Sequence, residues 1–158
     1  MTEGYIQIMI DSLDKKLVLL DKIMEINKRQ YEVSSVQPFD SQKYDEIMDE
    51  KGKLIDEINS LDEGFTSTYD IIKGEINAEP SKYRDKVLLL QELVRKAVDK
   101  GVEVEVQEKR NKNSLEASIS MARKELQQKR ISRNVALQYY KSSQKINNVD
   151  PQLMDKKK

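Results

Sequence analysis

The fold of this chain is decided by residues 40–76, which read DSQKYDEIMDEKGKLIDEINSLDEGFTSTYDIIKGEI. Nine side chains in this stretch recur at alternating steps of three and four residues: Tyr44, Ile47, Lys51, Leu54, Ile58, Leu61, Phe65, Thr68 and Ile72. Such steps keep side chains on one face of a helix, whereas a strand would send them to alternate faces. The rest of the surface is acidic, so the stretch predicts one amphipathic helix that needs partner helices to cover its stripe.

The residues before this helix repeat its pattern. Helix is predicted over about residues 2–33, with Thr2 as N-cap and the seam Ile6, Ile10, Leu13, Leu17, Leu20, Met24, Asn27 and Tyr31. Asn27 falls in the seam, where one polar residue can fix the register of packed helices. Pro38 disfavours helix at the residue before it, and Asp40 or Ser41 can cap the next helix. A connection this short makes the two helices antiparallel neighbours.

A third and longer helix is predicted over residues 81–143. Residues 77–80, NAEP, end the second helix, and the third begins with the stripe Tyr83, Val87, Leu90, Val94 and Ala97. Residues 102–106, VEVEV, alternate with the period of two that is typical of a strand. A lone five-residue strand would leave its backbone groups unpaired, so we expect helix through it. This helix would span about 95 Å at 1.5 Å per residue, against about 50 Å for the first.

These elements predict an all-α fold. We expect an elongated antiparallel three-helix bundle with a long, partly protruding C-terminal helix. The helices over about 2–33, 40–76 and 81–143 belong to a single bundle of residues 1–145. Residues 146–158, which include Pro151 and end in three lysines, are predicted to form a flexible tail.

The composition excludes several classes of function. The chain contains no His and no Cys, which removes the usual general base, the commonest metal ligand and all thiolate chemistry. No Gly-rich phosphate loop occurs, so we expect no enzymatic activity, no catalytic residue, no metal site and no cofactor. No apolar run approaches the roughly 18 residues that cross a bilayer, and the first residues lack the basic region and apolar stretch typical of a secretory signal. We therefore expect a cytoplasmic protein that does not insert into membranes.

The formal net charge of zero hides a split between the two halves of the chain. Residues 1–80 carry 9 Lys or Arg against 18 Asp or Glu, and residues 81–158 carry 19 against 10. The basic stretch 109–145 is a candidate for nucleic-acid binding. Attraction between this stretch and the acidic second helix explains the split better, because no aromatic stacking platform or Gly-rich loop adjoins it. No nucleic-acid partner is therefore expected.

Two motifs occur in the order found in a known family of helical proteins. Residues 44–65, YDEIMDEKGKLIDEINSLDEGF, resemble the middle helix of the FlgN-like flagellar export chaperones, with its acid-rich turn, seam lysine, aliphatic pair and Leu-Asp-x-Gly-Phe close. Residues 106–112, VQEKRNK, resemble the Glu-x-x-Asn-Lys stretch of the third helix in that family. The resemblance covers most of the chain.

The resemblance implies a cytoplasmic, non-enzymatic chaperone of the flagellar type III secretion system. Such proteins hold hook-associated proteins, the subunits of the hook–filament junction, in soluble form and deliver them to the export gate. The overlong third helix offers anchors for an amphipathic client helix: Leu115, Ile119, Ala122, Leu126 and Val135. Tyr139 and Tyr140 stand where the family carries a C-terminal tyrosine used at the export gate.

Three other interpretations of these residues stay open. The anchors could instead pack on the first two helices or on a second copy, and the tyrosines could serve ordinary packing. A coiled-coil adaptor or homodimeric scaffold, with contacts over residues 115–126, is the structural alternative. A nucleic-acid binder that uses the basic C-terminal half is a weaker one.

Overall fold

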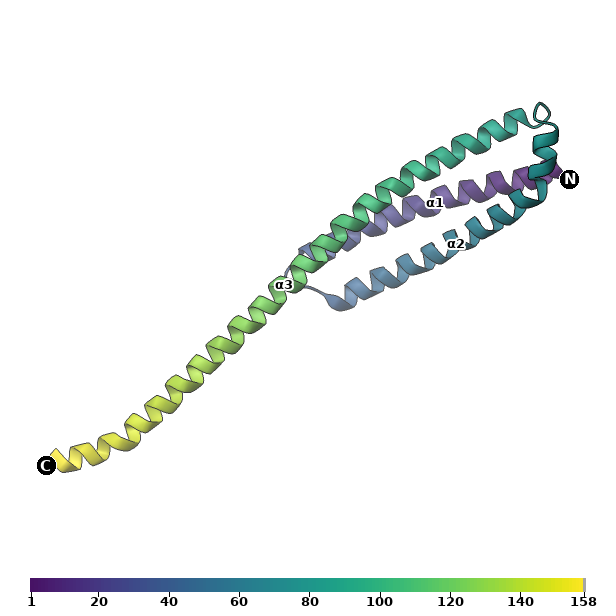
Figure 1. Ribbon diagram of the computed structural model, residues 1–158. Helices are drawn as coiled ribbons and strands as arrows, with labels where there is room; N and C mark the ends of the chain where they lie inside the picture. Colours follow the sequence, from purple (N-terminus) through teal and green to yellow (C-terminus); the bar gives the residue numbers. More distant parts are fainter. Residues whose placement is uncertain (158) are drawn as a thin grey trace. The chain divides into compact units, whose positions relative to one another are not determined.

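The computed structural model describes the backbone of residues 1–157 and the side chains of residues 1–143. Within this part the chain forms three α-helices, α1 (Thr2–Ser35), α2 (Ser41–Ala78) and α3 (Arg84–Lys157), and no strand (Figure 1). The all-α prediction is confirmed, and residues 102–106 are helical despite their alternating sequence. The chain divides into two compact units, the N-terminal unit Met1–Glu116 and the C-terminal unit Ala117–Lys158.

The observed helix ends lie within three residues of the predicted ones, except that α3 ends much later than predicted. α1 and α2 each continue two residues beyond the expected end, and α3 begins three residues after the expected start. Asp40 caps α2, because its side chain accepts a hydrogen bond from the Lys43 backbone N–H at 3.1 Å. α3 runs past residue 143 to Lys157. The predicted flexible tail, 146–158, lies outside the residues whose side chains are described, and it stays a prediction.

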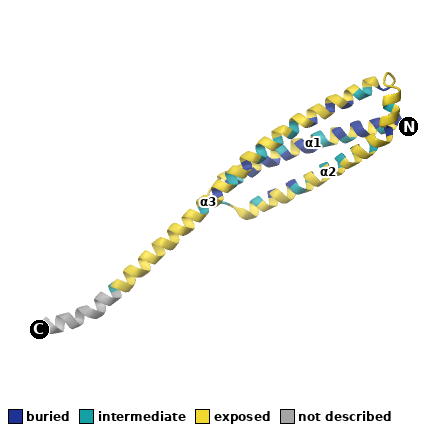
Figure 2. Cartoon of the chain, in the orientation of Figure 1, coloured by how far each residue is buried: buried dark blue, intermediate teal, exposed yellow. Residues whose placement is uncertain are grey.

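The N-terminal unit is a three-helix bundle in which consecutive helices are antiparallel (Figure 1). Every one of the nine seam positions predicted for α2 is buried or half-buried. α1 is nevertheless the central helix, because it buries twelve residues where α2 buries three (Figure 2). Apolar residues outside its seam, such as Met9, Leu19 and Ile23, are buried too. They widen the apolar face of α1 enough to contact both neighbours.

The core of this unit is apolar at the end where α1 starts and α2 stops. Its buried residues come from α1, α2, α3 and the residue before α3: Ile6, Met9, Ile10, Leu13, Ile72, Tyr83, Leu90 and Leu93. Partly buried apolar side chains, Phe65 and Val87 among them, pack around this cluster. Removal of this surface from water is the main favourable contribution to folding.

The end of the bundle near the α1–α2 connection is held together by polar side chains. Asn27 Nδ2 donates a hydrogen bond to Gln107 Oε1 at 3.1 Å, and Asn111 Nδ2 donates to the backbone oxygen of Asn27 at 3.1 Å. Lys51 of α2 forms an ion pair with Glu108 of α3. Asn27 lies in the seam as predicted and is fully buried. Because these contacts form in only one alignment, this end specifies the register of the three helices.

Candidate protein-binding site

Large apolar side chains are exposed along the C-terminal unit. Helix forms here because residues 117–143 contain no Gly or Pro and many good helix formers. Exposed fractions lie between 39% and 75% for Ile119, Met121, Leu126, Ile131, Val135, Leu137, Tyr139 and Tyr140. Figure 2 shows most of this segment of α3 as exposed. A contiguous group of exposed apolar side chains on a helix marks a candidate surface for another protein.

The predicted client-binding residues do not lie together on one surface of α3. Leu115 belongs to the N-terminal unit and is half-buried. Ile119, Ala122 and Leu126 belong to the C-terminal unit and share a face, because they are three and four residues apart. Val135 follows Leu126 by nine residues, which is two and a half turns of helix. It therefore lies on the opposite face, where it cannot join the other three in one contact.

A second apolar face was missed by the sequence interpretation. Ile131, Val135 and Tyr139 are exposed and follow one another at steps of four residues, so they share a face. Ile131 lies five positions after Leu126, not three or four, so it falls on a different face of the helix. The signal that could have revealed it is the change from three-and-four spacing to a step of five.

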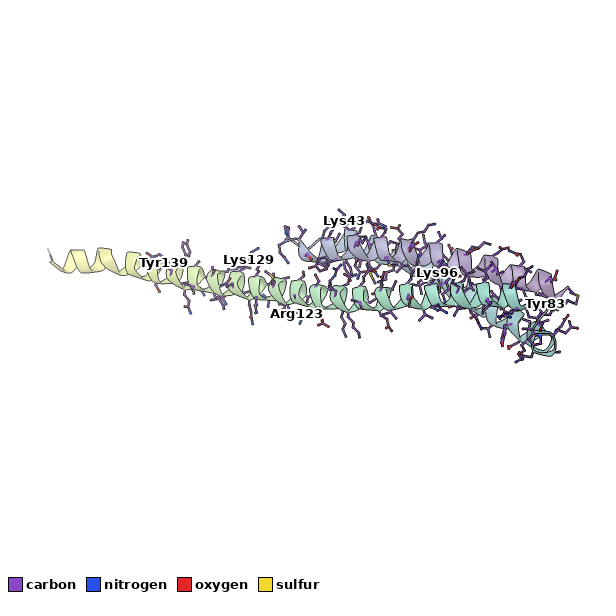
Figure 3. All side chains as sticks on the ribbon, turned by 90° about the horizontal axis from the view of Figure 1, so that it is seen from above. Lys43, Tyr83, Lys96, Arg123, Lys129 and Tyr139 are labelled. Atoms are coloured by element: carbon purple, nitrogen blue, oxygen red, sulfur yellow. The ribbon has the colours of Figure 1, made fainter. Side chains whose placement is uncertain are left out.

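Basic side chains far outnumber acidic ones along this segment. Residues 117–143 carry the exposed cations Arg123, Lys124, Lys129, Arg130, Arg133 and Lys141 against one acid, Glu125. Figure 3 labels Arg123, Lys129 and Tyr139 on this part of α3. A partner that covers the apolar faces would therefore gain from carrying acidic residues at its margins.

Tyr139 and Tyr140, the predicted docking residues, are both exposed. Adjacent residues of a helix point about 100° apart, so the two rings do not share a face. Tyr139 extends the face of Val135, whereas Tyr140 lies three residues from Leu137 and closer to that side of the helix. Each ring therefore offers a separate contact.

A polar cluster joins the helix ends at the apolar end of the N-terminal unit. Thr2 is the first residue of α1 and not its N-cap, a position that Met1 occupies. The Thr2 hydroxyl instead donates a hydrogen bond to the Glu75 carboxylate, which also accepts one from the Tyr83 hydroxyl at 2.9 Å. The Thr2 and Tyr83 hydrogen bonds lower the pKa of Glu75, and burial raises the pKa of Tyr83. These two hydrogen bonds join the start of α1 and the residue before α3 to the end of α2, so the cluster serves as a clamp between helices.

This clamp should make stability depend on pH. Because the pKa of Glu75 is lowered in the folded state, its contribution is present above about pH 4.3, the ordinary glutamate value. It should be lost as the pH falls further, through the lowered pKa. We expect Glu75→Gln to be less stable than the wild type at neutral pH and to lose less stability between pH 5 and pH 3. Thermal unfolding followed by circular dichroism across this range measures both effects.

Glu63→Gln is the matched control for this prediction, since Glu63 is an exposed carboxylate of the same helix. It should follow the wild-type dependence on pH. An equal loss of stability on acidification in Glu75→Gln and in the wild type would contradict the role of the clamp.

A groove of about 810 Å³ lies between α1 and α2. Its lining mixes charges of both signs with apolar side chains, Asp14, Lys15, Val18 and Leu61 among them.

Among the described residues, no three carboxylates gather closely enough to hold a metal ion. In the same part of the chain, no helix combines the length and apolar character that crossing a membrane requires. Comparisons with protein-family models, with curated proteins and with solved structures find no match to this chain.

Proposed function

We propose that this chain is a cytoplasmic, non-enzymatic export chaperone of the FlgN-like type. It would bind hook-associated proteins of the flagellum and deliver them to the type III export gate. The observation that carries the proposal is the exposure of large apolar side chains along residues 119–135 of α3. The two motifs at 44–65 and 106–112 support it as a resemblance.

The physical basis is the cost of leaving this surface in water. Burial of apolar surface contributes about 25 cal/mol per Å², so a partner that covers these side chains gains affinity from each of them. An amphipathic client helix fits this geometry, because its own apolar stripe can pack along Ile119, Ala122 and Leu126. The excess of cations favours a client helix with acidic margins and would speed its association at low salt.

Capture of purified subunits tests the proposal directly. The full chain is mixed with separately purified hook-associated proteins, and complexes are detected by size-exclusion chromatography and quantified by calorimetry. We expect a stable complex with at least one of them and none with flagellar subunits that lie outside the hook–filament junction. A folded chain that binds no hook-associated protein would refute the proposal.

Substitution of the tyrosines separates docking from client capture. We expect Tyr139→Ala and Tyr140→Ala each to leave client affinity within about threefold of the wild type, while one of them lowers binding to the cytoplasmic domain of the export gate about tenfold or more. Surface plasmon resonance with the immobilised gate domain measures the second effect. Tyr69→Ala, at an exposed tyrosine of α2, is the control. Unchanged gate binding in both variants would remove the docking role.

A homodimeric scaffold is the second candidate, favoured by the spacing of Ile119, Ala122 and Leu126, which also suits a coiled coil. Sedimentation distinguishes the two. Dimerisation through these residues would be lost in Leu126→Asp without any client present. A chain whose self-association is unaffected by Leu126→Asp is not such a scaffold.

A further inference from the structure

Four exposed valines form a row on the part of α3 that belongs to the N-terminal unit. Val94, Val98, Val102 and Val106 are spaced four residues apart, and their exposed fractions lie between 39% and 63%. Side chains at steps of four make a continuous ridge along a helix, and we call these four residues the valine ridge. The neighbouring Ala97 is buried against the bundle. Leu90, four residues before Val94, is buried too, so the ridge begins at the flank of the bundle and turns away from it toward Val106.

The valine ridge accounts for the alternation at residues 102–106. In the helix, Val102 and Val106 lie on the ridge, whereas Val104 is half-buried. Valine is a weaker helix former than Leu or Ala, because its branched side chain is restricted in a helix. Four valines that are 39% to 63% exposed thus cost helix stability and gain less packing than core positions would. A scattered exposed valine needs no explanation, but a continuous apolar row marks an interaction surface.

We propose that a second copy of this chain binds along the valine ridge in an antiparallel orientation. With Val98 placed against Val102 of the second copy, Val94 meets Val106, and the pairing repeats through a two-fold axis near residue 100. The ridge occupies twelve residue steps, about 18 Å of helix. Ridges of this kind from two helices pack into each other's grooves at an angle of roughly 50°.

The distribution of charge selects this occupant and this orientation. The exposed cation Arg95 lies toward the N-terminal end of the ridge, and the exposed acids Glu103 and Glu105 lie toward its C-terminal end. Lys96 lies on the far side of the helix, where it pairs with Glu92 at 3.8 Å. Antiparallel pairing sets the basic end of each copy against the acidic end of the other. Parallel pairing would set like charges together, which is unfavourable.

One charge pair is especially well placed. Arg95 directly follows Val94, and Glu103 directly follows Val102, so both lie on the same side of the valine ridge. A two-fold axis keeps this side aligned in both copies. In this register position 95 of one copy faces position 105 of the second copy, which is two residues from Glu103. Asp99, which follows Val98 on the same side, is four residues from Arg95 of its own chain and can share that cation.

The contact is short, so the dimer should be weak and reversible. A single ridge pairing of this length buries less than the roughly 1,200 Å² of stable complexes. We expect association at micromolar to millimolar protein, and this self-association does not rest on the proposed export function.

Sedimentation equilibrium from low micromolar to millimolar protein tests the surface. Val102→Lys should weaken dimerisation at least tenfold, since it puts a buried cation at the centre of the contact. Val18→Lys in α1 is the matched control, because both valines are 54% exposed. A wild type that stays monomeric at millimolar protein, or a Val102→Lys variant that dimerises like the wild type, would overturn the proposal. A dimer lost in Leu126→Asp and kept in Val102→Lys would also overturn it.

A charge exchange tests the orientation. Arg95→Glu alone sets acid against acid in its own dimer, and Glu103→Arg alone sets base against base, so each variant should dimerise several-fold more weakly. An equimolar mixture restores both opposite-charge pairs in the mixed dimer, which should recover the wild-type affinity. A mixture that associates no better than its components would rule out this register.

Disulfide trapping gives an independent answer, because the chain has no cysteine of its own. Under mild oxidation, a mixture of Val98→Cys and Val102→Cys should yield the mixed disulfide between the two variants in excess over either homodimer. Cross-linking needs Cα atoms within about 7 Å, and only antiparallel pairing brings 98 and 102 this close. A predominance of the two homodisulfides would indicate parallel pairing and contradict the proposal.

Discussion

Leu126→Asp should weaken client binding by about 100-fold or more. Leu126 is 56% exposed in the C-terminal unit, and Ile119 and Ala122 share its face at helical steps. Interface positions that anchor a complex typically contribute 2–4 kcal/mol, which is about 30- to 1,000-fold in the dissociation constant. A buried carboxylate among basic neighbours adds a desolvation cost on the chaperone and repels the acidic margins of the client. Calorimetric titration of the client into the variant measures the loss.

The matched control is Val18→Asp, which puts the same charge on an apolar residue of similar exposure, 54%, in α1. It should bind the client as the wild type does, and both variants should keep the wild-type unfolding temperature within about 2 °C, since surface substitutions cost little. Val135→Asp then reports on the opposite face, and a loss there as large as in Leu126→Asp would mean that the client contacts both faces. Wild-type client affinity in Leu126→Asp would contradict the proposed site.

The helices could be predicted from the sequence because three-and-four spacing is a local property of the chain. Each of the nine seam residues of α2 is turned toward the bundle, and the polar seam position Asn27 is fully buried. The central place of α1 depends instead on the width of its apolar face, which the spacing of a single seam does not measure. The bond from Thr2 to Glu75 joins residues 73 positions apart, so no local rule could anticipate it.

The candidate site was harder to predict, for a physical reason. The same spacing describes residues that face a core, a partner or water, so Leu90 and Leu126 look alike in the sequence although the first is buried and the second exposed. Val135 was grouped with Leu126, although nine residues leave a half-turn of helix between them. Client binding at either position stays a prediction. Exposure requires coordinates, whereas the division of the anchors into two faces follows from their spacing once this segment is known to be helical.

Glu108→Ala should lower the free energy of unfolding by about 2 kcal/mol. Lys51 is 4% exposed at its side chain and forms its ion pair with Glu108, whose side chain is 40% exposed. Without this carboxylate, the Lys51 ammonium keeps only the hydrogen bond to Gln30 Oε1 at 3.1 Å. Breaking a fully buried pair costs about 3–5 kcal/mol, and we expect less here because water reaches the half-exposed side of the site. Urea unfolding followed by far-ultraviolet circular dichroism measures the change.

Asp62→Ala provides the control, because Asp62 pairs with Lys16 across α1 and α2 at 2.7 Å with both side chains partly exposed. Its loss should cost less than about 1 kcal/mol, as is usual for exposed pairs.

A second substitution distinguishes an uncompensated charge from simple loss of packing. Lys51→Met in the Glu108→Ala background removes the stranded ammonium while keeping a long apolar side chain in place. The double variant should regain more than half of the lost stability, although Gln30 Oε1 then lacks its donor and recovery stays incomplete. If the double variant is no more stable than Glu108→Ala, the cost lies in packing, and the buried charge does not set the stability of the polar end.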